Sequence, residues 1–385
     1  MGGHGNGPAE LRETSLLRVG VVGCGKIAEA HIEQIRATGI AAPVAVCDRE
    51  PLMAAQLAER MTVPAAYGDL ERMLEAQHLD VVHIATPPQS HVGLARMCFE
   101  AGAHVFMEKP FAVDAVGAAD ILRAAEATAR RVSVNYLYNF ETPYLELLQC
   151  MRSGALGRLV HLETMYGYNL GGDYGLAVLG DPGHWVHQLP GKLFQNVLDH
   201  VVAKLVPLLD EGELHVSVSA FRRREATGIE GLDDLPDELR FQLGCGSTTV
   251  GGVVSAHIRP VCHLLRVFGA RGSAELDMNA RTFVQMETQT IPTALGRLLP
   301  AWRTARQYRR NAWRNVRRFG RYEFHFFQGM RVLLSEFYRA VSQGGSDPIS
   351  KTTILRTAQT IDAIIGAGGL AARSEVDRAA GSRPL

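Results

Sequence analysis

Short apolar runs alternate with longer helical patterns over the first third of the chain. The runs LLRVGVVG, VAVCD, VVHIATPP, HVFMEKP and RVSVNYLY each have the length and composition of a buried strand. Between them lie segments with apolar residues at helical spacing, such as PLMAAQLAERM and AVGAADILRAAEATA. Strands that alternate with helices of about 10–15 residues predict an α/β fold with a parallel, doubly wound sheet.

The first strand runs into a glycine-rich turn, Gly23-Cys24-Gly25-Lys26-Ile27-Ala28, which has the GxGxxA spacing. Gly23 allows the tight turn, Gly25 lets backbone amides approach a pyrophosphate, and Ala28 lets the next helix pack closely. The amino end of that helix also offers free N–H groups to phosphates. The turn therefore predicts a dinucleotide site that includes Gly23, Gly25, Lys26, Ile27 and Ala28.

The second strand ends in Asp48, twenty residues beyond Ala28. A carboxylate at this place accepts hydrogen bonds from the adenosine ribose hydroxyls, which favours NAD as the cofactor. Arg49 follows it and offers a guanidinium to a 2′-phosphate, so NADP stays open as the alternative. Because ligands of such sheets bind at the carboxyl ends of the strands, the cofactor side also includes Thr86, Pro87, Glu108 and Lys109.

Length and composition agree with a globular α/β protein. The 385 residues are enough for two domains, and 46% of them are hydrophobic. The 40 basic residues balance the 40 acidic ones, which argues against a nucleic-acid-binding protein. The six cysteines are scattered without metal spacing, as expected for reduced thiols in the cytoplasm. The start of the chain lacks a secretory signal pattern, and we expect flexible tails over residues 1–15 and 372–385.

Glu108-Lys109-Pro110 resembles the EKP signature of the Gfo/Idh/MocA oxidoreductases, the glucose–fructose oxidoreductase and inositol dehydrogenase family. The resemblance covers almost the whole chain, including ATPPQSH with His91, NYLYNF, GALGRLVHLE and GKLFQNVLDH. It implies a Rossmann domain over residues 16–137, with His91 among its cofactor-binding residues. It also implies an α+β domain over residues 138–371, with an open, mostly antiparallel sheet that walls the substrate pocket. Six strand-like runs between residues 158 and 278 agree with such a sheet.

The resemblance implies hydride transfer between NAD(P) and a secondary alcohol or ketone of a sugar, cyclitol or nucleotide sugar, in a homodimer or homotetramer. The family's catalytic stretch typically reads GG-x-L-x-D-x-G-x-H, with Asp and His four residues apart. Here Asn196 and His200 hold these places, on one face of a predicted helix. By resemblance, His200 is the general acid/base and Lys109 its electrostatic partner.

The stretch departs from the family pattern at Asn196 and Lys192. An amide at position 196 cannot stabilise imidazolium with a negative charge, so we expect a lowered pKa for His200. Asp199 lies about 100° away from His200 around a helix, and we expect it to be a poor substitute for the missing Asp. Lys192 replaces a glycine and adds a cation that could face an anionic substrate group.

Further substrate-pocket candidates come from three other segments: Tyr136 and Asn139 in NYLYNF, Tyr168 in GYNLGG, and His184 in GDPGHWVHQLPG. Their alternative role is structural, as core, cap or loop residues. His184, His187 and His200 have no carboxylate or cysteine pattern beside them, so we predict that the protein holds no metal.

Two other functions fit the same sequence. Asn196 is compatible with a cofactor-binding regulator or scaffold that kept the fold and lost turnover. Redox-neutral cleavage of glycosides with retained NAD, which some relatives of this family perform, is the second alternative.

The segment PAWRTARQYRRNAWRNVRRFGRY, from Pro300 to Tyr322, belongs to none of these motifs and contains no acidic residue. It predicts a two-faced helix over about residues 300–320, with Pro300 in its first turn. One face carries Trp302, Tyr308, Trp313, Val316 and Phe319, and most arginines lie beside it.

Four interpretations of this helix stay open. Its apolar face packs on the second domain or on a partner subunit. It lies peripherally on a membrane, which suits lipid-linked or cell-surface sugars. Its arginines hold an anionic group of the substrate at the pocket mouth. It binds nucleic acid, which the neutral chain does not favour.

Overall fold

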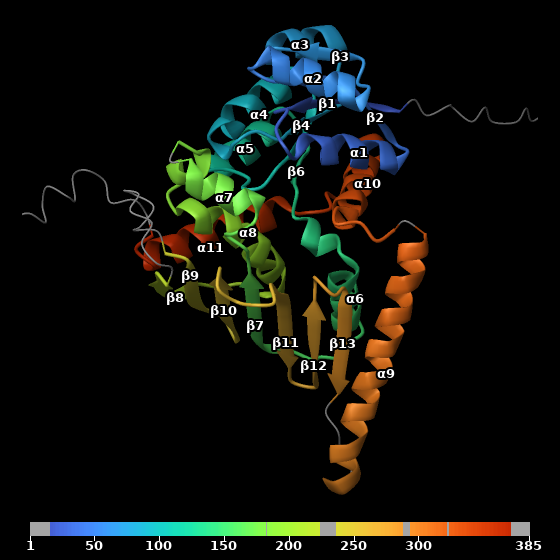
Figure 1. Ribbon diagram of the computed structural model, residues 1–385, viewed down its shortest axis with the longest axis vertical. Helices are drawn as coiled ribbons and strands as arrows, with labels where there is room; N and C mark the ends of the chain where they lie inside the picture. Colours follow the sequence, from blue (N-terminus) through green and yellow to red (C-terminus); the bar gives the residue numbers. More distant parts are fainter. Residues whose placement is uncertain (1–15, 182, 224–235, 288–292, 322, 371–385) are drawn as a thin grey trace, which may run out of the picture.

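The computed structural model contains two sheets, one above the other along the long axis in Figure 1. It describes residues 16–181, 183–223, 236–287, 293–321 and 323–370. The tails expected at residues 1–15 and 372–385 lie outside the described residues.

The first sheet has six parallel strands in the order β3-β2-β1-β4-β5-β6, which confirms the predicted doubly wound architecture. The strands are β1 (Leu17–Val22), β2 (Ala41–Cys47), β3 (Ala65–Tyr67), β4 (Val81–Ile84), β5 (His104–Met107) and β6 (Val132–Val134). Helices pack on both faces: α1 (Ala28–Thr38), α2 (Pro51–Met61), α3 (Leu70–Gln77), α4 (His91–Glu100) and α5 (Ala115–Ala127). The strand order reverses between β1 and β4, and such a switch point opens a crevice at the carboxyl ends.

The second sheet has seven strands in the order β13-β12-β11-β7-β10-β9-β8. All of its neighbouring pairs are antiparallel except β7 with β10, so the predicted mostly antiparallel sheet is confirmed. Its strands are β7 (Leu159–Gly167), β8 (Leu214–Phe221), β9 (Glu238–Cys245), β10 (Thr248–Ser255), β11 (His263–Gly269), β12 (Gly272–Asp277) and β13 (Thr282–Glu287).

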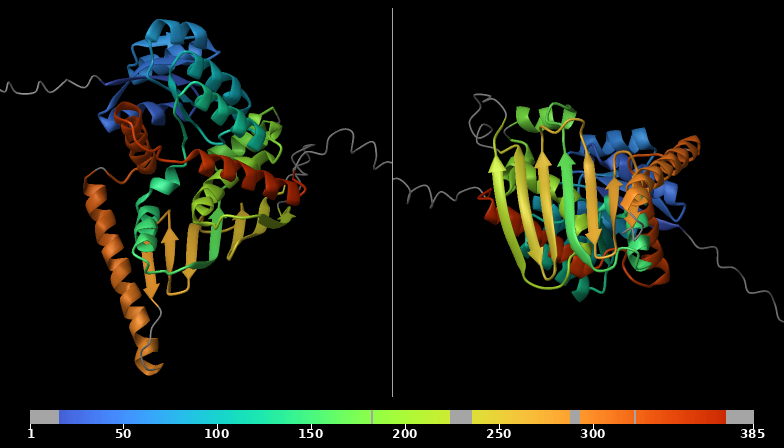
Figure 2. Two further views of the ribbon diagram at one scale, coloured as in Figure 1. Left: turned by 180° about the vertical axis from the view of Figure 1, so that it is seen from behind. Right: turned by 90° about the horizontal axis from the view of Figure 1, so that it is seen from below.

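Helices cover one face of this second sheet and leave the other face open, as the view from below in Figure 2 shows. The covering helices are α6 (Thr142–Arg152), α8 (Lys192–Leu205) and α11 (Lys351–Ala367), and α7 (Asp173–Gly180) lies above them. The side chains alternate between the two faces along each strand, as in β8.

The chain returns to the first domain through α10 (Gln328–Gln343), which packs against α1. Five of its side chains are almost fully buried in the core of the first domain: Met330, Leu333, Leu334, Phe337 and Tyr338. The first domain therefore draws part of its core from far beyond residue 137.

Helix α9 (Thr293–Gly320) runs along β13, the edge strand of the second sheet (Figure 1). Side-chain amides join the two. Gln307 donates to and accepts from the backbone of Gln285, at 2.8 and 2.9 Å, and Asn311 donates to Phe283 O at 2.8 Å. Asn315 donates to Ala280 O at 2.9 Å. These amides satisfy backbone groups that an edge strand otherwise leaves unpaired.

The helix differs from the sequence prediction in two ways. It begins seven residues earlier, at Thr293, so that Pro300 lies inside it and not in its first turn. The face that packs on the sheet is the polar one, and Trp302, Trp313 and Phe319 are exposed. The interpretation that the apolar face packs on the second domain is therefore wrong.

Replacing Asn311 with Ala should destabilise the protein by about 1–3 kcal/mol, because it leaves a buried carbonyl of β13 without its donor. Urea unfolding measures the effect. Gln149→Ala, at an exposed position of α6, is the matched control and should change stability by less than about 0.5 kcal/mol. Equal stability of the two variants would contradict the role given to the amides.

Candidate active site

The glycine turn between β1 and α1 has the shape that a dinucleotide needs. Gly23 has φ +92°, and a Cβ there would lie 2.8 Å from the backbone of Ala85, so only glycine fits. A Cβ on Gly25 would meet no atom within 4 Å, so the space above this backbone is open. Ala28 is fully buried against the sheet, and Lys26 and Ile27 lie between them at the start of α1.

Asp48, at the end of β2, is tied to this turn. Its Oδ2 accepts a hydrogen bond from Cys24 N at 2.7 Å, and its Oδ1 accepts one from Glu50 N at 3.0 Å. The side chain is only partly buried, whereas Arg49 is exposed. The carboxylate is thus held beside the glycine turn, where a ribose would lie.

The loop after β4 contains three of the predicted cofactor-binding residues. Thr86 Oγ1 contacts Ser90 Oγ at 2.7 Å, and Pro87 precedes the turn that starts α4. His91 is fully buried, and its ring nitrogens lie 2.9 Å from Thr86 O and 3.1 Å from Phe111 O. Burial lowers the pKa of His91, so the neutral ring donates to one of these carbonyls at a time. His91 therefore joins the loops after β4 and β5.

Glu108, at the end of β5, is buried in a hydrogen-bonded network that the sequence did not predict. Its Oε1 accepts from His31 Nε2 at 3.0 Å and from Asn135 Nδ2 at 2.6 Å. The network continues from His31 to His83 at 2.8 Å, and from His83 to the hydroxyl of Tyr338 at 2.8 Å.

Burial alone would raise the pKa of the Glu108 carboxyl, but the bonds from His31 and Asn135 and the Lys109 charge hold it below its ordinary value. The second oxygen, Oε2, accepts from Lys109 N at 3.0 Å. Glu108 therefore positions the backbone of the neighbouring Lys109.

Lys109 reaches from the first domain to α8 of the second. Its Nζ donates to Asn196 Oδ1 at 2.9 Å and lies 3.3 Å from Asn196 O. Burial lowers the pKa of Lys109, and the charges of Glu108 and Asp199 oppose this effect. The sequence predicted that Asn196 shares a helix face with His200, and the structure shows that its side-chain oxygen and its carbonyl contact Lys109.

Asp199 is the residue that the sequence analysis undervalued. It is buried, and its carboxylate lies near Lys109 and is hydrogen-bonded to the hydroxyl of Tyr136. Burial raises the pKa of Asp199 to about 7, although Lys109 and Tyr136 lower it. The available signal was its i, i+3 spacing from Asn196, which places both side chains on the face toward Lys109.

His200 lies one residue further along α8 and is partly exposed. Its ring lies edge-on to Tyr138 and beside Tyr166, with centroid distances of 5.4 and 5.8 Å. Burial, followed by the nearby cations Lys109 and Lys204, holds the pKa of His200 well below its ordinary value. The pKa of His200 is thus lowered, as expected. The causes, however, are burial and the nearby cations, and not the lack of a carboxylate at position 196.

A second buried cluster lies behind His200. Lys204 has no exposed surface, and its Nζ donates to the carbonyl of His200 and lies 2.6 Å from His263 Nε2. Burial lowers the pKa of Lys204 well below its ordinary value. The ring of His263 stacks edge-on to Tyr138 at 4.3 Å. This cluster fixes the helical turn that carries His200.

The remaining pocket candidates lie at the edges of the site. Tyr136 is buried and bonded to Asp199, and Asn139 Nδ2 donates to Ala203 O at 2.7 Å, which ties it to α8. His184 Nδ1 accepts from Val186 N at 3.3 Å and caps a short helical turn, in a loop that Gln89 reaches through Trp185 O. In the described ranges, no three His, Cys, Asp or Glu side chains gather in a way that could hold a metal ion.

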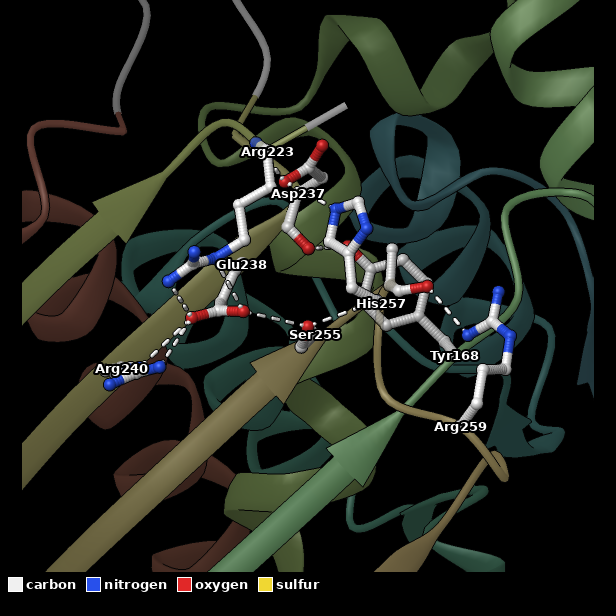
Figure 3. Close-up of polar contacts among 9 residues, drawn as sticks. Tyr168, Arg223, Asp237, Glu238, Arg240, Ser255, His257 and Arg259 are labelled. Carbon is white, nitrogen blue, oxygen red and sulfur yellow. Dashed lines mark hydrogen bonds and ion pairs between the residues drawn. The ribbon is translucent and has the colours of Figure 1, made fainter. Parts of the chain in front are cut away.

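Tyr168 lies beside a polar cluster at the ends of β8, β9 and β10 (Figure 3). Its hydroxyl donates to Asp237 O at 3.2 Å, and its ring stacks with that of Tyr166 at 6.5 Å. Asp237 Oδ1 lies 3.0 Å from His257 Nε2. The neighbouring Glu238 is bonded by Arg223, Arg240 and Ser255. The cluster gives two buried carboxylates polar partners at the ends of these strands, and Tyr168 connects it to Tyr166.

These contacts define a doubly wound sheet whose carboxyl edge has the open glycine turn and the oriented carboxylate that a dinucleotide requires. Asp48 and the open glycine turn lie at one end of that edge, and Lys109, Asn196, Asp199 and His200 meet at the other. A lysine and a histidine with lowered pKa values beside a buried carboxyl can exchange a proton with a bound hydroxyl group.

Comparison with known proteins identifies the family that the first domain matches. Residues 17–136 match the Gfo/Idh/MocA model, described as an oxidoreductase family with an NAD-binding Rossmann fold. The first domain therefore matches the NAD-binding Rossmann fold of that family, as the resemblance recognised from the sequence implied.

Two curated relatives match the N-terminal part. Inositol 2-dehydrogenase 4 of Saccharopolyspora erythraea is 34% identical over 144 residues, which are 37% of this chain and 43% of that protein. A glycosyl hydrolase family 109 protein of Shewanella pealeana is 28% identical over 163 residues, or 40% of this chain and 36% of that protein. The match thus spans about two-fifths of the length of these relatives.

The fold is shared over a greater length. The WlbA dehydrogenase from Bordetella pertussis, solved in complex with NADH and UDP-GlcNAcA, superposes with a TM-score of 0.74. The superposition covers 92% of this chain and 96% of that chain at 18% sequence identity. The likeness extends the shared fold to the second domain.

Replacing Asp199 with Asn should stabilise the protein at neutral pH but not in acid. A carboxyl whose pKa is raised from 3.8 to about 7 on folding costs nothing below the unfolded pKa. The cost grows as pH rises through the folded pKa, to at most on the order of 4 kcal/mol. Urea unfolding at about pH 4 and about pH 8 measures the difference, with the exposed Glu71→Gln as control. A stability gain of equal size at both pH values would contradict the assignment.

Lys192 has φ +47°, in the left-handed region that favours the glycine of the family pattern. Lys192→Gly should therefore be more stable than Lys192→Ala by about 1 kcal/mol. Both variants remove the charge, but only glycine adopts the left-handed conformation without strain. Thermal unfolding of the two variants measures this difference. If the Ala variant were the more stable one, the left-handed conformation would be contradicted.

Proposed function

We propose that the protein is an NAD-dependent oxidoreductase that transfers hydride between the nicotinamide and a secondary alcohol or ketone. The substrate class is a sugar, cyclitol or nucleotide sugar. One observation carries the proposal. At the carboxyl edge of the first sheet, which also holds the glycine turn, four polar residues lie together: Lys109, Asn196, Asp199 and His200. The family of the first domain and the names of its relatives support it.

The residues present fit the cofactor. The open backbone at Gly25 leaves room for a pyrophosphate, and Asp48 is oriented by Cys24 N to accept ribose hydroxyls. The exposed Arg49 leaves NADP as a weaker alternative. When bound, NAD supplies the hydride acceptor of the reaction.

His200 takes the proton of the substrate hydroxyl, since its lowered pKa keeps the ring neutral at physiological pH. Lys109 lies beside it and stabilises the negative charge that develops on the oxygen. Asn196 holds the ammonium group in place at 2.9 Å. Asp199, with a pKa of about 7, can hold a proton near Lys109 and so share the proton transfer that the sequence had assigned to His200 and Lys109.

A second candidate is redox-neutral cleavage of a glycoside with NAD retained between turnovers. The similarity to a glycosyl hydrolase family 109 protein favours it. The same Lys109 and His200 would serve both reactions, because each begins with proton removal from a hydroxyl group.

The open face of the second sheet fits a homodimer or homotetramer. It carries a hollow of about 610 Å³ lined by residues from β7 to β11. Met165 on β7 and Phe268 on β11 are among its more exposed large apolar side chains. Stable oligomers bury such faces against one another.

Lys109→Ala and His200→Ala should each reduce NADH formation from the active substrate by at least about a hundredfold while cofactor binding remains. A screen of cyclitols, sugars and nucleotide sugars, followed by NADH absorbance, identifies the substrate, and NAD fluorescence titration measures binding. Arg152→Gln, an exposed position on α6, is the control.

Three outcomes separate the candidate functions. NADH formation that depends on both residues supports the dehydrogenase. Glycoside cleavage without net NADH supports the redox-neutral enzyme. NAD binding without turnover of either kind would leave a regulator or scaffold and contradict both enzymatic proposals.

A further inference from the structure

The outward half of α9 combines large apolar side chains with arginines. Trp302 is 71% exposed, Trp313 64% and Phe319 74%, and helical spacing places the exposed Leu298 and Val316 on the same side. They point outward because the opposite side is docked on β13 through Gln307, Asn311 and Asn315. The apolar stripe is therefore held on the surface by the fold and is not covered by any described residue of the chain.

The arginines of α9 have few anionic partners within the protein. From Thr288 to Tyr322 the chain contains no Asp or Glu, and nine arginines lie between Arg297 and Arg321. Among the described residues, Arg314 is the member of this set that forms an ion pair, with Glu146. Seven of the nine are exposed, and helical spacing places four of these beside the apolar stripe: Arg303, Arg306, Arg310 and Arg317.

The arginines also surround a hollow of about 730 Å³ near the carboxyl end of the helix. Five arginines between Arg310 and Arg321 line it together with Trp313 and Glu323. Several guanidinium groups around one space form a site for phosphate oxygens, since each can donate two parallel hydrogen bonds.

We propose that the outward half of α9 binds the surface of a bilayer that contains anionic phospholipids. Tryptophan and phenylalanine enter the boundary between headgroups and acyl chains, and the neighbouring arginines bind headgroup phosphates. None of the described helices is long and apolar enough to cross a membrane. The helix, about 42 Å long at 1.5 Å per residue, lies along the surface.

A second copy of this chain fits the same face less well. Pairing α9 with α9 would bring two arginine arrays together, and neither helix has a carboxylate to neutralise them. Anionic headgroups supply the charge that this surface lacks. The inference does not depend on the proposed dehydrogenase activity, because binding to vesicles requires no turnover.

Sedimentation of the full chain with vesicles tests the proposal. One set of vesicles is phosphatidylcholine, and the other contains equal parts of phosphatidylcholine and phosphatidylglycerol. We expect binding to the anionic vesicles that weakens as salt is raised. A triple variant, Arg306→Gln, Arg310→Gln and Arg317→Gln, should weaken this binding by roughly a hundredfold.

Two further variants complete the test. Trp302→Ser, Trp313→Ser and Phe319→Ser together should abolish binding even at low salt. The charge-matched control replaces exposed arginines on other helices, Arg72→Gln, Arg152→Gln and Arg339→Gln, and should bind like the unchanged protein. All replaced side chains are exposed, so urea unfolding should give the same midpoint for each variant.

Three results would overturn the proposal. The first is no binding of the unchanged protein to anionic vesicles. The second is equal loss in the charge-matched control, which would assign binding to overall charge. The third is an oligomer in sedimentation velocity without lipid that the aromatic variant dissociates, which would assign the face to self-association.

Discussion

The charge on Lys109 is the constraint around which the two domains are arranged. A lysine in a partly buried seam keeps its charge more readily where oxygen atoms surround it. Glu108 is already bonded to His31 and Asn135, so the remaining oxygens come from Asn196 and Asp199 on α8. The end of β5 and the face of α8 are thereby joined by a polar contact, and the position of His200 follows from it.

Most of the first domain could be predicted because its information is local. Each strand is followed by its own helix, and the GxGxxA turn and the strand-end Asp48 read as one motif. The second sheet could be predicted only as a class. β7 lies between β10 and β11, which follow it by more than eighty residues, and β10 is its parallel neighbour. No local pattern encodes such a pairing, because it depends on which strands share a buried face.

The site and the arginine helix show where pattern rules fail. The four-residue spacing placed Asn196 and His200 on one helix face, but the prediction considered only the effect of Asn196 on His200. Asp199 was judged by its angle to His200, whereas both Asn196 and Asp199 interact with Lys109. Lys109 approaches α8 from the first domain, and the sequence of α8 alone does not indicate which of its residues will contact Lys109. For α9, the rule that apolar faces pack inward fails because the helix packs on an edge strand. The backbone groups of that strand need hydrogen bonds, and the side-chain amides of Gln307 and Asn311 supply them.

The return of α10 into the first domain limits which segments of the protein can be exchanged by recombination. The hydroxyl of Tyr338 is bonded to His83, and the ring of Phe337 lies 5.9 Å from that of Phe106, so the family-matched segment 17–136 is completed by residues two hundred positions further on. An exchange that moved that segment alone would open its core and leave His83 Nε2 without the hydroxyl of Tyr338, while the contact with His31 stays within the segment. The two sheets therefore form one unit for recombination, because a helix that follows the second sheet in the chain completes the core of the first.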